Sequence, residues 1–201
     1  MARINDVYHS DIYITPAKEM FVPNPNSEFG LMQLKPDDFE EFYDLLERSY
    51  QGKTSYSIMY EGYFFRVERT VSMYGVMFCM RKMPKNVPDM SNLGYPAALV
   101  KYLISLGDAS GLILLGGATG SGKTTTISSL LREYLINNGG FAYTIEDPFE
   151  MPLDGEYHAA NGSIGLCKQT QPQNDNWGAS LRSALRSRPR YIMVGEIRTP
   201  E

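Results

Sequence analysis

One short loop limits what this chain can fold into more than any other feature. Residues 117–124 read Gly-Ala-Thr-Gly-Ser-Gly-Lys-Thr, which satisfies the phosphate-loop pattern G-x-x-x-x-G-K-[ST] at every fixed position. Glycines let backbone N–H groups turn toward phosphate oxygens, and the dipole of the following helix attracts anions. The pattern predicts a site for ATP or GTP in which Lys123 reaches the phosphates and Thr124 ligates Mg²⁺. The residues expected to hold the nucleotide are Gly117, Ala118, Thr119, Gly120, Ser121, Gly122, Lys123, Thr124 and Thr125.

Apolar runs around this loop alternate between strand and helix patterns. The expected strands are Leu112–Leu115, Phe141–Ile145 and Tyr191–Val194. The expected helices are one that begins at Pro96 and Lys123–Asn137, which Gly139-Gly140 ends. Continuous apolar strands that alternate with helices are typical of a parallel sheet covered on both faces. This part of the chain is therefore predicted to be an α/β domain with a mainly parallel sheet.

The residues before position 83 predict a small α+β domain. Pro36 is expected to open a helix whose first turn holds Asp37 and Asp38, where the helix dipole favours acidic side chains. The buried face of this helix is expected to carry Phe39, Phe42, Tyr43 and Leu46. The expected strands are Asp11–Thr15, Ser55–Tyr60, Tyr63–Thr70 and Val76–Lys82. Two prolines in Met83–Pro88 indicate a linker. We thus expect an N-terminal domain over 1–83, a linker over 84–94 and a P-loop ATPase domain over 95–201.

Composition narrows the class of protein. The net charge of −4 and the pI of about 5.3 argue against a dominant nucleic-acid surface. No apolar stretch approaches the roughly 20 residues of a membrane helix, and the N-terminus lacks a secretory apolar core. We therefore expect a cytoplasmic chain without membrane insertion. Cys79 and Cys167 are too far apart for a CxxC zinc motif and are expected to be buried thiols. His9 and His158 are expected on the surface.

Two acidic clusters directly follow predicted strands. Glu146-Asp147-Pro148-Phe149-Glu150 follows the second strand, and Gly195-Glu196 follows the third. Ligands of open parallel sheets bind beyond the carboxyl ends of the strands. Both clusters are therefore expected to face the nucleotide, where hydrolysis requires a held metal and an oriented water.

These segments resemble the type II/IV secretion ATPase superfamily. The run 146–150 resembles its Asp box, and Leu181–Arg186 followed by Tyr191–Arg198 resembles its atypical Walker B segment, which carries Gly-Glu. The opening Ser10–Ile14 is similar to that of the type IV pilus motor ATPases. The resemblance covers nearly the whole chain. It implies a RecA-like P-loop domain preceded by a small PAS-like α+β domain.

The resemblance also implies roles for individual residues. Glu146 would orient or activate the attacking water, and Glu196 would support the metal and the water. Arginines of the N-terminal domain would reach the nucleotide, and the candidates are Arg66, Arg69 and Arg81. The implied assembly is a homo-oligomer, a hexameric ring that binds inner-membrane platform proteins, so that the chain is peripheral to that membrane through its partners.

The chain departs from the family pattern at several places. Met73-Tyr74-Gly75 stands where retraction motors carry Asn-Arg-Gly, and Asp154–Trp177 is longer than expected. The chain ends at Glu201, just after the Walker B strand, so a truncated P-loop domain is expected, with turnover left open.

Four functions fit the sequence. The first is a motor ATPase for pilus assembly, pilus retraction or export, and the second is the ATPase of a conjugative or type IV secretion system. The third is a nucleotide-binding assembly module with little turnover. The fourth, a nucleic-acid motor, is disfavoured by the acidic charge balance. The sequence does not rank the first two.

Overall fold

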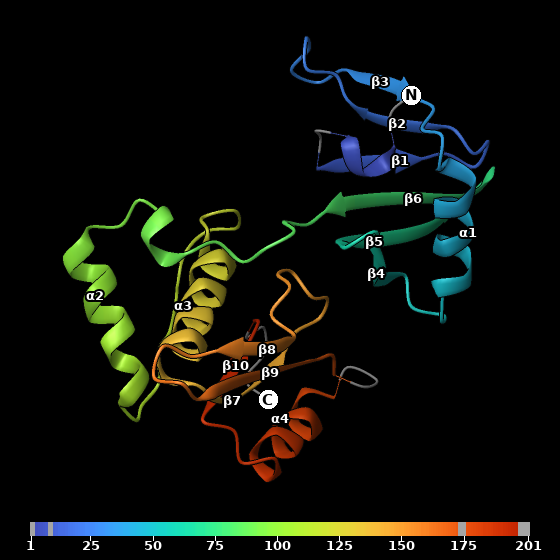
Figure 1. Ribbon diagram of the computed structural model, residues 1–201. Coiled ribbons are helices and arrows are strands. Elements are labelled where there is room, and N and C mark those ends of the chain that lie inside the picture. Colours follow the sequence, from blue (N-terminus) through green and yellow to red (C-terminus); the bar gives the residue numbers. More distant parts are fainter. Residues whose placement is uncertain (1–2, 8–9, 173–175, 197–201) are drawn as a thin grey trace. The chain divides into compact units, whose positions relative to one another are not determined.

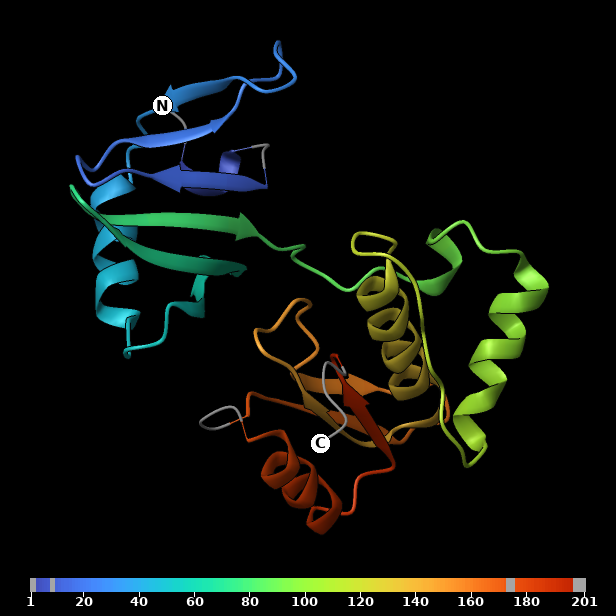
Figure 2. The same ribbon diagram turned by 180° about the vertical axis from the view of Figure 1, so that it is seen from behind.

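The computed structural model describes residues 3–7, 10–172 and 176–196, and the chain divides into two compact units, Met1–Lys85 and Asn86–Glu201 (Figures 1 and 2). In the first unit, six strands form an antiparallel sheet in the order β3-β2-β1-β6-β5-β4. The strands are β1 Asp11–Ile14, β2 Met20–Pro23, β3 Leu31–Leu34, β4 Ser55–Tyr60, β5 Tyr63–Ser72 and β6 Gly75–Lys82. A short 3₁₀ helix, Ile4–Asp6, precedes them, and the helix α1, Phe39–Ser49, packs on the sheet.

The core of this unit lies between α1 and the sheet. Phe42 and Leu46 of α1 are fully buried, and the Phe42 ring meets the rings of Tyr60 and Phe65 edge-on at 5.1 Å between centroids. The prediction for β1, β4, β5 and β6 is confirmed within two residues at each end. Strands β2 and β3 were not predicted.

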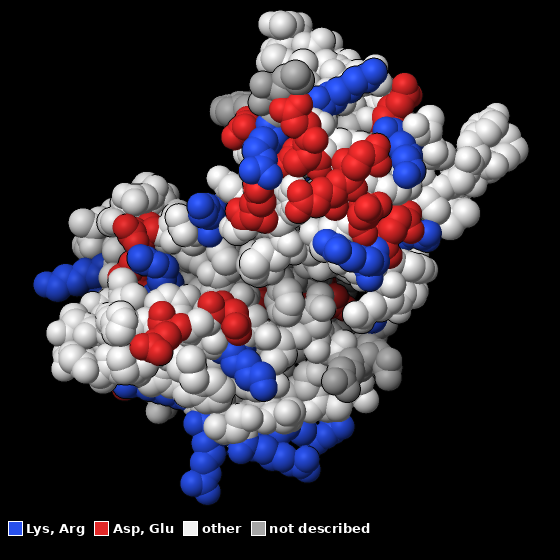
Figure 3. Space-filling view, turned by 45° about the vertical axis from the view of Figure 1, so that its right-hand side comes forward, with Lys and Arg blue, Asp and Glu red and all other residues white. Residues whose placement is uncertain are grey.

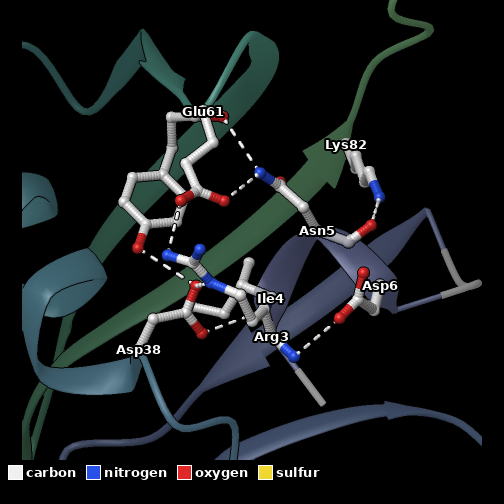
Figure 4. Close-up of polar contacts among 8 residues, drawn as sticks. Arg3, Ile4, Asn5, Asp6, Asp38, Glu61 and Lys82 are labelled. Atoms are coloured by element: carbon white, nitrogen blue, oxygen red, sulfur yellow. Dashed lines mark hydrogen bonds and ion pairs between the residues drawn. The ribbon is translucent and has the colours of Figure 1, made fainter.

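The start of α1 was predicted wrongly. The helix begins at Phe39 rather than Pro36, with Asp38 at its N-cap. The Asp38 carboxylate is engaged elsewhere: it accepts hydrogen bonds from Ile4 N at 2.9 Å and from the Tyr60 hydroxyl at 3.0 Å, beside the Arg3 guanidinium (Figure 4). Lys82 donates to the carbonyl of Asn5 at 2.6 Å in the same region (Figure 4). These bonds fasten the first described residues to α1 and to the sheet.

The second unit is built on a four-stranded sheet in the order β10-β7-β9-β8. Its strands are β7 Gly140–Ile145, β8 Gly155–His158, β9 Ile164–Thr170 and β10 Tyr191–Val194. Strands β10, β7 and β9 are parallel, whereas β8 pairs with β9 antiparallel. The helices are α2 Ala97–Ser105, α3 Lys123–Asn138 and α4 Trp177–Arg186, with 3₁₀ turns at Met90–Asn92 and Leu106–Asp108. The predicted parallel sheet is confirmed.

Helices cover both faces of this sheet. Leu131 and Leu135 of α3 pack with Ala142 and Cys167 on one face. On the other face, Ala184 of α4 packs with Tyr143 and Ile145, and Trp177 joins them. Strand β7 therefore lies between α3 and α4 (Figure 1), as its continuous apolar sequence predicts.

The prediction of a strand at Leu112–Leu115 was wrong. The segment has no regular secondary structure, and Leu112 and Leu114 are 81% and 68% exposed. Only Ile113 turns inward, against the cluster around Leu130 and Tyr134 of α3. An apolar run becomes a strand only when its backbone groups find a partner strand, and none pairs with this run among the described residues.

The remaining expectations concern single residues. Cys167 is buried and Cys79 half-buried, both as free thiols, and His158 is exposed. His9, together with Ile197 and Arg198 of the Walker B resemblance, lies outside the described residues. None of the helices in the described part of the chain combines the length and the apolar character that a membrane span requires.

Candidate functional site

The phosphate loop leads directly into α3. Gly120 and Gly122 have φ values of 78° and 87°, in the left-handed region that residues with a Cβ rarely adopt. Gly122 is the N-cap of α3 and accepts a hydrogen bond from Thr126 N at 2.9 Å. The Lys123 ammonium donates to the carbonyls of Gly117 and Ala118 at 3.0 and 2.8 Å. The cation thus lies over the loop, where an anion would meet it together with the N–H groups at the start of the helix.

The loop and the two acidic clusters share one end of the second unit. Helix α3 leads through Gly139 into β7, so the N-terminus of α3 lies at the carboxyl end of β7 (Figures 1 and 2). Strand β10 runs parallel to β7 with Val194 opposite Ile145, and Gly195 N donates to Ile145 O at 2.9 Å. Glu146 and Gly195-Glu196 therefore follow the ends of two adjacent parallel strands.

Glu146 is the most buried carboxylate of this edge. It is 2% exposed, and its Oε1 accepts hydrogen bonds from the Thr144 hydroxyl at 2.6 Å and from Gln169 Nε2 at 2.9 Å. Its Oε2 is buried without a hydrogen-bond partner among the described groups. Burial raises the pKa of Glu146, while the bonds from Thr144 and Gln169 and the nearby backbone N–H of Glu150 act in the opposite direction. A buried carboxylate with one unsatisfied oxygen is a recurrent property of catalytic sites.

The Gly-Glu pair lies against this carboxylate. A Cβ at Gly195 would come within 3.2 Å of Glu146 Cγ, so a glycine allows the two strand ends to approach. Glu196 follows, half-buried. Thr124 and Thr125 are half-buried in the first turn of α3, where Thr124 can present its hydroxyl to a metal.

The three candidate arginines belong to the first unit and not to this cluster. Arg81 on β6 donates to Asp11 at 2.8 Å. Arg69 on β5 lies 4.1 Å from the centroid of the Tyr50 ring. Arg66 is exposed on β5, opposite Arg81 in the strand register. The register thus places two arginines side by side on this sheet.

Gln169 and Thr144 were missed by the sequence analysis. Thr144 is a polar residue in an otherwise apolar strand, two positions before Glu146, and that spacing places both side chains on one face. This was a usable signal. Gln169 lies in the segment 154–177, which is longer than the family pattern, and no local pattern distinguishes it from Gln171.

The residues present fit a magnesium nucleotide. Left-handed glycines before a helix form the cradle that a triphosphate requires. Lys123 supplies a positive charge for the phosphates, and Oε2 of Glu146 supplies a hydrogen-bond acceptor. Mg²⁺, when bound, neutralises charge on the phosphate oxygens. No group of three His, Cys, Asp or Glu side chains suited to a metal occurs in the described residues.

Comparisons with known proteins also point to ATPases of pili and secretion systems. Residues 49–201 match the model of the family described as type II/IV secretion system protein. The chain is 30% identical over 137 residues to the type IV pilus ATPase PilU of Pseudomonas aeruginosa, a match that covers 68% of this chain and 34% of PilU. It is 35% identical over 169 residues to the type IV pilus retraction ATPase PilT of the same organism, covering 82% of this chain and 43% of PilT.

A solved structure extends the likeness to the fold. The crystal structure of the pilus retraction motor PilT with bound ADP matches with a TM-score of 0.71 and 26% identity, covering 100% of this chain and 61% of that one. The α/β architecture is therefore that of a known ATPase. The chain spans less than half the length of the two curated relatives.

Proposed function

Because the chain belongs to the type II/IV secretion system protein family, we propose that it is an ATP-hydrolysing motor subunit of a bacterial pilus or secretion machine. The observation that carries the proposal is that the phosphate loop opens α3, while Glu146 and Gly195-Glu196 follow the neighbouring parallel strands β7 and β10, with Gly195 against Glu146. In this proposal the second unit contains a RecA-like P-loop domain over 95–201, after a linker over 84–94. The first is a PAS-like domain over 1–83.

The proposed roles follow from the positions of the side chains. Residues 117–125 hold the triphosphate, Lys123 lies against its charge, and Thr124 binds Mg²⁺ with indirect support from Glu196. Glu146 accepts a hydrogen bond from the attacking water, because Oε2 is its unengaged oxygen. Arg66 and Arg81 act on the nucleotide of a neighbouring subunit. Their exposure on the first unit, opposite each other in the register of β5 and β6, supports this role.

A homo-oligomer is supported by two surfaces of opposite charge. The turn before α1 and the solvent face of this helix carry an acidic stripe, Asp37, Glu40, Glu41 and Asp44, all exposed. The solvent face of α4 and the turn after it carry a basic face, Arg182, Arg186 and Arg188, also exposed. Acidic side chains gather over α1 and basic ones over α4 (Figure 3). When two different surfaces of one chain complement each other, copies join head to tail and close into a ring.

We propose a hexamer, cytoplasmic and held at the inner membrane by platform proteins of the machine. PilU and PilT are named as type IV pilus ATPases. Pilus assembly, pilus retraction and export are the three tasks that fit such a motor. A type IV secretion or conjugation ATPase is the sister possibility.

The test is phosphate release by the full chain over a range of protein concentrations, with ATP and then GTP. Turnover that rises faster than linearly with concentration is expected from a self-assembling ring. Lys123→Ala should weaken nucleotide binding. Glu196→Gln should lower kcat by about 10²-fold or more, because it removes the charge that supports the metal and the water, and leave binding intact.

A control substitution removes a carboxylate elsewhere. Glu156→Gln alters an exposed residue on β8 and should leave both binding and turnover unchanged. Nucleotide binding without any turnover in the wild type would contradict the motor and favour an assembly module. Stimulation of turnover by DNA would favour a nucleic-acid motor.

A further inference from the structure

Gln169 has no part in the roles given so far, although it lies beside the candidate catalytic carboxylate. It is on β9, opposite Thr144 of β7 in the parallel register. Strand β9 belongs to the segment 154–177, for which the family resemblance gives no role. The Gln169 side chain is half-buried.

The Gln169 amide uses its whole hydrogen-bonding capacity. Its Oε1 accepts from Leu153 N at 2.7 Å and from Asp154 N at 2.8 Å. Its Nε2 donates to Met151 O at 2.8 Å and to Glu146 Oε1 at 2.9 Å. A carboxamide has two donor hydrogens and two acceptor lone pairs. The two N–H partners on one side determine which end is oxygen, and any rotation of the amide breaks several bonds.

Glu146 is consequently held from two sides at one oxygen. Thr144 and Gln169 both donate to Oε1, while Oε2 has no protein partner among the described residues. Gly195 packs against Cγ on a third side, where a Cβ would lie within a tight 3.2 Å. The carboxylate therefore keeps one orientation.

We propose that Gln169 is a positioning residue: with Thr144, its amide nitrogen fixes Oε1 of Glu146 so that Oε2 stays available to the attacking water. The inference rests on the proposed ATPase function for the identity of that water. The same amide also links the segment 151–154, which follows the Asp box, to the carboxylate.

The two ends of the amide can be separated by one substitution. Gln169→Glu keeps an oxygen that accepts from Leu153 N and Asp154 N, but it replaces the nitrogen that donates to Glu146 and to Met151 O by an oxygen. We expect kcat for ATP to fall about tenfold or more, with the KM for ATP and the nucleotide affinity unchanged. Thr144→Val should also lower kcat, and Thr144→Ser, which keeps the hydroxyl, should restore it.

Gln171→Glu is the matched control. It makes the same chemical change two residues along the chain, on an exposed side chain that contacts Asp147 rather than Glu146. It should keep kcat within about twofold of the wild type, since exposed charges are largely screened. A merely structural role for Gln169 predicts something different: activity of Gln169→Glu would fall only in proportion to the unfolded fraction seen by circular dichroism.

Two outcomes separate this inference from the proposed function. Wild-type kcat in Gln169→Glu, together with an inactive Glu146→Gln, would overturn the positioning role and leave the ATPase intact. A Glu146→Gln variant as active as the wild type would instead remove Glu146 from the proposed mechanism.

A second measurement does not need turnover. Carbon-13 NMR can follow the Glu146 carboxyl during a pH titration, with Glu146→Gln for assignment. Gln169→Met and Thr144→Val each remove a donor that favours the ionised form, so the pKa of Glu146 should rise further in each. The other titratable groups that act on it, Glu150 and Cys167, are unchanged. An unaltered pKa in Gln169→Met would overturn the proposal.

Discussion

At the scale of single residues, a few side chains carry bonds that their neighbours cannot replace. Asp38 is such a residue in the first unit. It is 8% exposed and joins the N-terminal 3₁₀ helix to β4, because it accepts from Ile4 N and from Tyr60. Burial, together with this bond, raises the pKa of Tyr60 to about 12.

Asp38→Ala is expected to lower the free energy of unfolding by about 1–3 kcal/mol, because two buried donors lose their acceptor. Asp38→Asn keeps an acceptor oxygen and should cost less. Tyr60→Phe removes one bond and should cost about 1 kcal/mol. Urea unfolding of the full chain measures these differences. Asp37→Ala, exposed one residue earlier, should stay within about 0.5 kcal/mol of the wild type, and an equal loss in Asp37→Ala and Asp38→Ala would refute this account of Asp38.

At the scale of elements, the contact of α3 with β9 depends on a glycine. A Cβ at Gly165 would come within 2.8 Å of the Leu135 carbonyl oxygen. The backbone of α3 cannot yield as a side chain can. Strand and helix therefore approach closely only where the strand carries no side chain.

Two Gly→Ala substitutions should consequently differ in sign. Gly165→Ala should destabilise the second unit by about 1–3 kcal/mol through overpacking. Gly178→Ala lies in the first turn of α4, where its Cβ would meet the end of the Arg182 side chain at 3.4 Å and Asn176 Oδ1 at an ordinary contact distance of 3.8 Å. It should stabilise by up to about 1 kcal/mol through helix propensity. Thermal unfolding of both variants measures the change in Tm. Equal changes in Tm for Gly165→Ala and Gly178→Ala would contradict the expected difference in sign.

The same element explains what the sequence could not reveal. In β9 the buried positions hold Gly165 and Cys167, while Ile164 and Leu166 are 49% and 48% exposed. In most strands the large apolar residues are buried, whereas in β9 they are exposed. The reason is that α3 packs closely on β9 and leaves space only for small residues at the contact. Strand β7 was predictable because both faces of the sheet are covered there, so its apolar run is continuous. Strand β10 has the same kind of apolar run, although Ile192 and Val194 are exposed in the described part of the chain.

The candidate site was predictable for a related reason. The phosphate loop and the residues after β7 and β10 are local in sequence, so a motif and a strand end suffice to find them. Gln169 reaches Glu146 only through the pairing of β9 with β7, and no local pattern encodes that contact. The strand prediction for Leu112–Leu115 was wrong for the converse reason: the local apolar pattern is present, but no partner strand pairs with it among the described residues.

At the scale of the whole molecule, we expect the acidic stripe of α1 and the basic face of α4 to determine how copies meet in the proposed oligomer. Each surface repels its own kind, so a head-to-tail contact is the arrangement that satisfies both. Such a contact weakens as salt is added, because exposed charges are screened over about 8 Å at physiological ionic strength.

Charge exchange tests this arrangement. One variant carries Arg182→Glu and Arg186→Glu, and another carries Glu40→Lys and Glu41→Lys. Each alone should sediment as smaller species than the wild type at low salt, because both contacting surfaces then have one sign. An equimolar mixture should recover the larger species, since each variant now complements the other.

A control pair of the same charge change, Lys101→Glu and Lys168→Glu, lies on exposed residues outside both surfaces. It should leave the sedimentation of the chain unaltered. Failure of the mixture to reassociate would exclude the pairing of the acidic stripe with the basic face.

The place of Trp177 has a practical consequence. It is the one tryptophan in the sequence, and it packs with Tyr143 and Ile145 of β7, the strand that Glu146 follows. The chain thus contains a natural fluorophore that contacts the strand leading to the candidate site. Red-edge excitation isolates its emission from that of the tyrosines, so nucleotide titrations can be followed optically on the unlabelled protein.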